Sequence, residues 1–377
     1  MRNSSDGFFY SKNLLENHTF AKIHFLKDLL LITPPFTQLN TPYPATAYLK
    51  GFLNTKNISS YQIDLGIEVI LEIFSKKGVT EIFNVKPKNL SENAQRIFAL
   101  REEYIKTIDE VIAFLQNKKP TLARQICSMN FLPEASRFNQ LDDMEYAFGN
   151  MGLQDKAKHL ATLYLEDLSD YIIENIDENF GFSRYAERLG RSANSFDELY
   201  EKLQSDKTFV DNFTLEILDK KLLETKPKLV CFSVPFPGNL YSAFRCAQYI
   251  KNHYPKIKTA FGGGFANTEL RDLKDKRVFE FFDFITLDDG ELPIELLFEN
   301  ICHFEQSEES LFKRTFLLEN GEVVYKNNSE RHDYKQAEIG TPDYTDLPLD
   351  QYISVIEIAN PMHSLWSDGR WNKLTMA

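Results

Sequence analysis

The stretch Ile257-Lys258-Thr259-Ala260-Phe261-Gly262-Gly263-Gly264-Phe265 joins a short apolar β-strand directly to three consecutive glycines. Glycine has no Cβ atom and adopts positive φ angles readily, so such a turn lets a second chain segment or a flat ligand approach the backbone closely. A plain strand-to-helix turn would also account for the three glycines. The neighbouring sequence must therefore show whether a binding site lies at this strand end.

A second strand with an unusual loop lies upstream. Residues 229–234 are apolar and continue into Pro235-Phe236-Pro237-Gly238, after which a helix is expected over residues 239–253. Downstream, a strand is expected around Phe284, followed by Asp289-Gly290-Glu291 and a helix over residues 291–302. Strands that alternate with helices form parallel sheets, and ligands of such sheets bind at the carboxyl ends of the strands.

The beginning of the chain shows the same alternation. Residues 28–33 predict a buried parallel strand that is closed by Pro34-Pro35, and Tyr61 to Leu65 predict another that is closed by Gly66. A helix is expected between them. We therefore predict an α/β fold with a doubly wound, Rossmann-like or flavodoxin-like, mainly parallel sheet of about five strands.

The segment between the two halves of the sheet is expected to be a large helical insertion. Apolar and aromatic residues between Ala157 and Ile172 repeat at helix spacing, which is more typical of a core than of a cofactor site. Ser195 and Glu198 predict a capping box at the start of a short helix. Further on, Asn320-Gly321 between two apolar runs predicts a β-hairpin.

These patterns predict five parts along the chain. They are a peripheral segment at residues 1–27; an α/β domain at 28–66 and 228–302; the helical insertion at 67–227; a charged loop and hairpin at 303–340; and, at 341–377, a linker with a strand-like run from Tyr352 to Ala359 and the first strand of a further domain.

Composition excludes several classes of function. The chain has 377 residues and a net charge of -12 without a basic block, so we expect no nucleic-acid partner. No apolar run is long enough for a membrane span. The four cysteines, Cys127, Cys231, Cys246 and Cys302, lack the local spacing of a zinc or iron–sulfur motif. We expect buried free thiols in the reducing cytoplasm, and assign no catalytic residue and no metal ligand.

Taken together, these motifs resemble the N-terminal cobalamin-binding half of the cobalamin-dependent radical S-adenosylmethionine enzymes. The resemblance covers residues 28–66 and 228–302 and leaves the helical insertion unexplained. It implies cobalamin as cofactor. The residues that it assigns to cofactor binding are Pro34, Pro35, Leu65, Gly66, Ser233, Val234, Gly262, Gly263, Gly264, Asp289, Gly290 and Glu291.

The resemblance also suggests how these residues would act. Ser233 could hydrogen-bond the nucleotide tail of cobalamin, or its own backbone instead. The three glycines would let the tail pass close to the main chain. Glu291 could favour a helix start or contact a corrin amide. The Asp-x-His-x-x-Gly motif is absent after the first strand, so cobalamin would bind without a histidine axial ligand.

In this family the C-terminal half is a partial barrel whose C-x-x-x-C-x-x-C loop holds an iron–sulfur cluster. Residues 366–377 resemble the approach to that loop, and the chain stops before the cysteines. We therefore expect the cluster, S-adenosylmethionine, the unknown substrate and the methyl transfer or other radical chemistry only in a longer chain. The alternative is a doubly wound nucleotide-binding or protein-interaction domain without cobalamin, in which the glycine turn would serve a phosphate.

Overall fold

A computed structural model describes residues 27–87, 91–128, 131–143, 152–191, 195–302 and 310–355. Their sheet has seven strands in the order β2-β1-β3-β4-β5-β6-β7. Strands β1 to β5 are parallel, whereas β6 and β7 are antiparallel. The bounds are β1 Leu29–Thr33, β2 Ser60–Asp64, β3 Leu229–Ser233, β4 Lys258–Gly262, β5 Phe284–Thr286, β6 Thr315–Glu319 and β7 Glu322–Lys326.

The first five strands confirm the predicted α/β class with a mostly parallel sheet. Their order, 2-1-3-4-5, is the order of flavodoxin-like folds, in which the chain changes direction between β1 and β3. The expected strand count was too low, because the hairpin of β6 and β7 joins the sheet through β5. Its turn is the predicted one, since Asn320 and Gly321 both have positive φ angles, of 51° and 80°.

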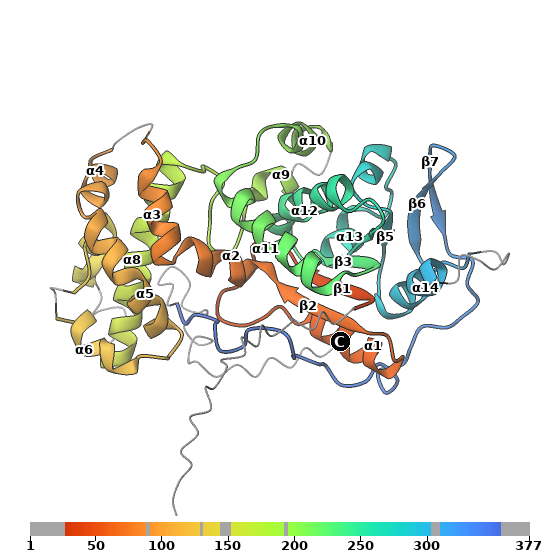
Figure 1. The fold of residues 1–377 in the computed structure, drawn as a ribbon, viewed down its shortest axis with the longest axis horizontal. Coiled ribbons are helices and arrows are strands. Elements are labelled where there is room, and N and C mark those ends of the chain that lie inside the picture. The colour runs from red at the N-terminus through yellow and green to blue at the C-terminus, as the bar shows by residue number, and fades with distance from the viewer. Residues whose placement is uncertain are drawn as a thin grey trace, which may run out of the picture.

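Helices cover both faces of the parallel strands (Figure 1). Side chains of a strand alternate between faces, so Leu29 and Leu31 pack on one side of β1 whereas Leu30 and Ile32 pack on the other. Helices α1 Ala45–Thr55 and α14 Glu291–Cys302 cover the first side. Helices α2 Leu65–Ile73, α11 Phe209–Thr225 and α12 Leu240–His253 cover the second.

The expected helical insertion divides into two groups of helices. Helices α2 and α11 pack on the sheet, whereas a separate group of helices gathers at one end of the molecule, on the left of Figure 1. The apolar stripe of α8 is core, as predicted, and Tyr164, Leu168 and Ile172 are fully buried. The group is α3 Lys76–Asn84, α4 Glu92–Ala99, α5 Arg101–Leu115, α6 Ala123–Ile126 and α8 Leu153–Asn175.

The described residues also form the shorter α-helices α9 Glu187–Arg191, α10 Asp197–Gln204 and α13 Gly264–Glu269. The predicted capping box at α10 is wrong. The helix begins at Asp197, so Glu198 stands too early in it, and the Ser195 hydroxyl contacts Asp197 instead. A capping box does occur at α11, between Thr208 and Asp211.

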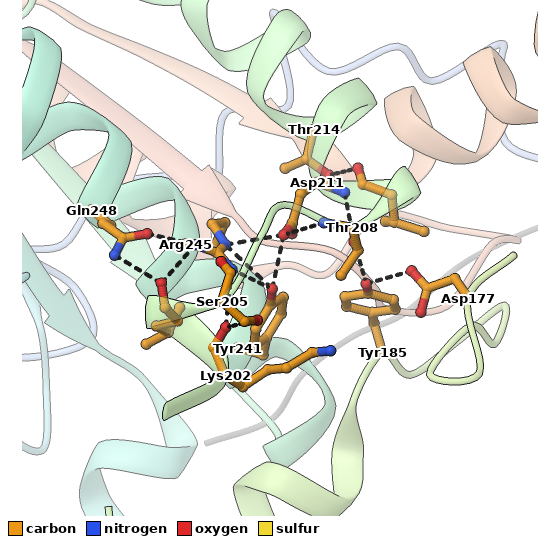
Figure 2. Close-up of polar contacts among 12 residues, drawn as sticks. Asp177, Tyr185, Lys202, Ser205, Thr208, Asp211, Thr214, Tyr241, Arg245 and Gln248 are labelled. Carbon is orange, nitrogen blue, oxygen red and sulfur yellow. Dashed lines mark hydrogen bonds and ion pairs between the residues drawn. The ribbon is translucent and has the colours of Figure 1, made fainter. Parts of the chain in front are cut away.

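Asp211 also belongs to a buried polar cluster between α11 and α12 (Figure 2). Its carboxylate accepts a hydrogen bond from the Tyr241 hydroxyl at 2.8 Å and pairs with Arg245 Nε at 3.0 Å. Arg245 Nη1 in turn donates to the carbonyl oxygen of Leu203 at the end of α10. The cluster therefore connects α10, α11 and α12 on the face of the sheet that α11 and α12 cover.

After β7 the chain crosses back over the molecule as a C-terminal strap, residues 327–355, drawn in blue in Figure 1. The N–H of Asp343 donates to the Ala47 carbonyl oxygen of α1, and Lys50 Nζ donates to Thr345 Oγ1 at 2.7 Å. The Tyr352 hydroxyl then reaches Asp64 at 2.8 Å. The described residues of the predicted linker, 341–355, are thus bound to α1 and to the carboxyl end of β2.

The structure corrects one further expectation from the sequence and does not describe the residues that would test others. Residues 352–355 do not form a strand, because their backbone bonds loops and helix ends rather than another strand. The remaining residues of that run, the tail 366–377 and the charged loop at 303–309 lie outside the described residues. None of the helices in the described ranges combines the length and apolar character that a bilayer crossing requires.

Candidate functional site

A cavity of about 430 Å³ opens at the carboxyl ends of the parallel strands. It lies on the side of the sheet that α1 and α14 cover, and the strap closes part of it. This is the position at which open α/β sheets bind ligands. The strand residues that line it are Leu31, Cys231, Phe232, Ser233, Ala260, Phe261, Gly262 and Thr286.

The floor of the cavity is formed by small residues of β3 and β4. Ser233 lies beside Gly262 in the parallel register, and Cys231 lies beside Ala260. Because these four positions carry little or no side chain, the cavity extends down to the surface of the sheet. A ligand group could therefore enter between the sheet and the two helices.

Ser233 is the polar group on this floor. The residue is buried, and its hydroxyl forms no hydrogen bond with any other described residue. The structure thus does not contain the bond to its own backbone that was the alternative explanation of this serine. A hydroxyl in this position can donate one hydrogen bond to a ligand and accept two.

The glycine turn holds two loops together beside the cavity. The Val234 N–H donates to the Gly262 carbonyl oxygen at 2.8 Å, and the Phe265 N–H donates to the Val234 carbonyl oxygen at 3.0 Å. Gly263 has a φ of 102°, and a Cβ atom there would lie 2.8 Å from the Val234 oxygen. The turn therefore requires glycine at 263 for its own packing.

The cavity has an acidic wall, formed by Asp288, Asp289, Glu291 and Asp333. Two of these carboxylates already pair with arginines that do not line the cavity, Asp288 with Arg271 and Asp333 with Arg314. Burial raises the pKa of Glu291, which is also the first residue of α14. Among the described residues that line the cavity, none is Lys, Arg or His. The walls therefore suit ligand groups that donate hydrogen bonds better than they suit phosphates.

Aromatic residues surround the mouth of the cavity. Tyr43 lies just before α1, Tyr48 lies within α1, and Tyr334 comes from the strap. The Phe236 ring is 53% exposed and lies edge-on to Tyr43 with ring centroids 5.8 Å apart. Exposed aromatic side chains of this kind offer an apolar surface to a flat ligand.

The cavity brings together part of the predicted site. Ser233, Gly262, Gly263, Asp289, Gly290 and Glu291 line it, whereas Pro34, Pro35, Leu65, Gly66, Val234 and Gly264 do not. The Pro34 oxygen accepts a hydrogen bond from Asn239 Nδ2, Leu65 and Gly66 begin α2, and a Cβ at Gly264 would lie 2.9 Å from the Pro235 oxygen.

The sequence did not suggest the residues that the start of α1 and the strap contribute. A helix was expected between the first two strands, but no pattern linked that helix to a ligand. Asp333, Tyr334 and Ile339 belong to the segment 303–340, which had been assigned to a charged loop and hairpin. Only the fold brings these two parts of the chain together.

The four cysteines differ in solvent exposure more than expected. Cys231 and Cys246 are buried, and burial raises the pKa of the Cys231 thiol to about 12. The expectation was wrong for Cys302, which is exposed, and for Cys127, which is half-buried. The described residues contain no group of three His, Cys, Asp or Glu side chains placed to hold a metal ion.

Comparison of the chain with protein-family models, with curated proteins and with solved structures finds no match.

Proposed function

We propose that the cavity binds cobalamin and that the chain is the cobalamin-binding part of a radical S-adenosylmethionine protein. The observation that carries the proposal is the slot at the carboxyl ends of the strands, with its floor of Ser233, Ala260 and Gly262. Cobalamin is a flat corrin with a long nucleotide tail, so it requires a slot beside an open apolar platform. The exposed ring of Phe236 and the neighbouring Tyr43 support such a platform.

The chemistry of the walls supports the same ligand. Corrin amides donate hydrogen bonds, which the acidic wall and the Ser233 hydroxyl can accept. A nucleotide with several phosphates would call for basic side chains, and none of the described lining residues is basic. We therefore favour cobalamin over a phosphate-rich nucleotide. No histidine lines the described cavity, so the proposal includes no histidine ligand to cobalt.

In this proposal the residues of the chain bind and orient the cofactor. Bound cobalamin would supply a cobalt centre for methyl transfer or other radical chemistry. The iron–sulfur cluster, S-adenosylmethionine and the substrate would belong to a longer chain. The proposal places the protein in the reducing cytoplasm.

The test is a binding experiment with hydroxocobalamin. The protein is incubated with it and separated by gel filtration, and the visible absorbance that travels with the protein is measured. In Ala260→Leu the new side chain fills the slot, so we expect cobalamin affinity to fall by at least about tenfold. The matched control Ala99→Leu adds the same side chain at an exposed position at the end of α4 and should bind normally.

A wild-type protein that retains no cobalamin would refute the proposal. Equal affinity of Ala260→Leu and wild type would place cobalamin elsewhere. Gly263 is unsuitable for this test, because a side chain there disturbs the contact with Val234 and so the fold.

A further inference from the structure

Strand β7 is the outer strand of the sheet, and one of its edges faces away from β6. The two-residue turn makes Glu319 and Glu322 a hydrogen-bonded pair, and such pairs alternate along an antiparallel hairpin. The N–H and C=O groups of Val324 therefore point toward β6. Those of Val323 and Tyr325 point to the outer edge, beyond which the described residues form no further strand.

The sequence of β7 is complementary to itself when two copies run antiparallel. With Val324 opposite Val324 of a second copy, the outward groups of Val323 face those of Tyr325. Both members of such a pair exchange hydrogen bonds. The same register places Glu322 opposite Lys326 at each end of the strand. Shifting the register by two residues loses both charge pairs.

The charges of the single chain favour this arrangement. Glu322 lies opposite Glu319 across the hairpin, and like charges in directly opposed positions destabilise a sheet. Lys326 pairs with Glu319, and no described cation pairs with Glu322. A lysine from a second copy would supply the missing positive charge.

The hairpin also exposes apolar side chains on one face. Leu318 is 42% exposed and Tyr325 is 47% exposed, and they share this face with Val323. In the antiparallel register Tyr325 lies opposite Val323 of the second copy. Pairing would therefore bury apolar surface in addition to joining the backbones.

We propose that the protein forms a homodimer in which β7 pairs antiparallel with β7 of a second copy, about a two-fold axis at Val324. The two sheets then form one continuous sheet. Charged residues on a strand edge normally prevent pairing with foreign strands. In the proposed dimer the charged residues also select the register. Glu322 lies opposite Lys326 of the partner subunit in only one antiparallel alignment.

The first test is sedimentation of charge variants. The wild-type protein should sediment as a dimer. Glu322→Lys places a new lysine against Lys326 of the partner subunit at both ends, so the dissociation constant of the dimer should rise at least about tenfold. Adding Lys326→Glu should restore the dimer. The control Glu330→Lys makes the same charge change at an exposed position beyond β7 and should have no effect.

A monomeric wild-type protein, or a Glu322→Lys variant that remains dimeric, would overturn the proposal. So would a double variant that stays monomeric, since the charge pairs would then not be restored. Glu322→Lys should fold normally, because the new lysine faces Glu319 within the hairpin. These measurements need no cofactor, so they stand apart from the cobalamin proposal.

The second test is a disulfide across the proposed axis. Opposed residues of a non-hydrogen-bonded pair lie close enough for a disulfide bond. Val324→Cys in a Cys302→Ser background, which removes the exposed thiol, should cross-link two chains on mild oxidation. Tyr325→Cys in the same background should not, because its equivalent in the second copy lies two positions away. Equal cross-linking of both variants would contradict the register.

Discussion

Asp64 is fully buried at the carboxyl end of β2. Its side chain accepts hydrogen bonds from the N–H of Gly66 at 2.9 Å and of Ile67 at 3.3 Å, which caps α2. It also accepts one from the Tyr352 hydroxyl of the strap. Burial nevertheless raises the pKa of Asp64 to about 6, because these bonds do not fully replace the water around the charge.

The raised pKa predicts a stability change with pH. Asp64 in the unfolded chain ionises at its ordinary pKa of 3.8, whereas in the folded protein it ionises near 6. The folded protein therefore holds a proton in this window that the unfolded chain has lost. The free energy of unfolding should fall as pH rises between these values, by up to about 3 kcal/mol.

Asp64→Asn removes this titration, so its free energy of unfolding should fall less steeply over the same window. Part of the slope should remain, because burial also raises the pKa of Asp167 to about 6. Urea unfolding at three pH values across the window measures both slopes. Identical slopes for the variant and the wild type would show that Asp64 does not titrate as described.

At the scale of single elements, the buried pair of Arg245 and Asp211 links α12 to α11 (Figure 2). Both side chains are less than 5% exposed. Removing one partner of a buried ion pair leaves the other charged and without compensation. We therefore expect Arg245→Met to lower the free energy of unfolding by about 3–5 kcal/mol, measured by urea denaturation.

The double variant Arg245→Met with Asp211→Asn should recover part of that loss, since no buried charge remains. Lys119→Met is the matched control, because it breaks the exposed pair with Glu110 and should change stability by less than about 1 kcal/mol. A loss for Arg245→Met no larger than for the control would contradict a stabilising role for the cluster.

The sequence predicted most elements of the sheet because their apolar runs end at glycine, proline or charged residues. The helix expected at 291–302 has those bounds, and the strand expected at 257–261 is shifted by one residue in β4. The capping box at Ser195 failed because a motif of two residues does not determine where the helix begins. The antiparallel pairing of β6 with β5 could not be predicted, because the sequence of neither strand shows which strand lies beside it.

At the scale of the whole molecule, the strap joins regions that are far apart in the sequence. Lys50 donates to Thr345, and Ile353 N–H donates to the Leu39 carbonyl oxygen. Ser354 N–H donates to the Leu115 carbonyl oxygen at the end of α5. The strap thus connects α1 and the sheet to the group of helices beyond it.

We expect a chain that ends at Gly340 to be less stable than one that ends at Val355. The shorter chain loses Thr345, Asp346 and Tyr352, which are the strap partners of Lys50 and Asp64. The difference in free energy of unfolding should be at least about 3 kcal/mol by urea denaturation. Equal stability of the two chains would show that the strap only rests on the surface.

The residues of the candidate site also divide into those that the sequence predicted and those that it did not. Ser233, Gly262 and Asp289 could be predicted, because carboxyl ends of parallel strands converge at one edge of a sheet. Tyr43 and Tyr334 could not, since they meet only after α1 and the strap have packed together. Sequence patterns describe local periodicity, whereas this part of the cavity depends on contacts between segments almost 300 residues apart.

The pairing of β1 with β3 has a consequence for synthesis of the chain. Leu29 pairs with Leu229, so β1 leaves the ribosome roughly 10 to 40 seconds before its second neighbour at ordinary translation rates. In that interval only β2 can pair with it, while the intervening helices fold through local contacts. The nascent chain therefore presents one unpaired edge of a leucine-rich strand until β3 is made, and such edges are prone to aggregation.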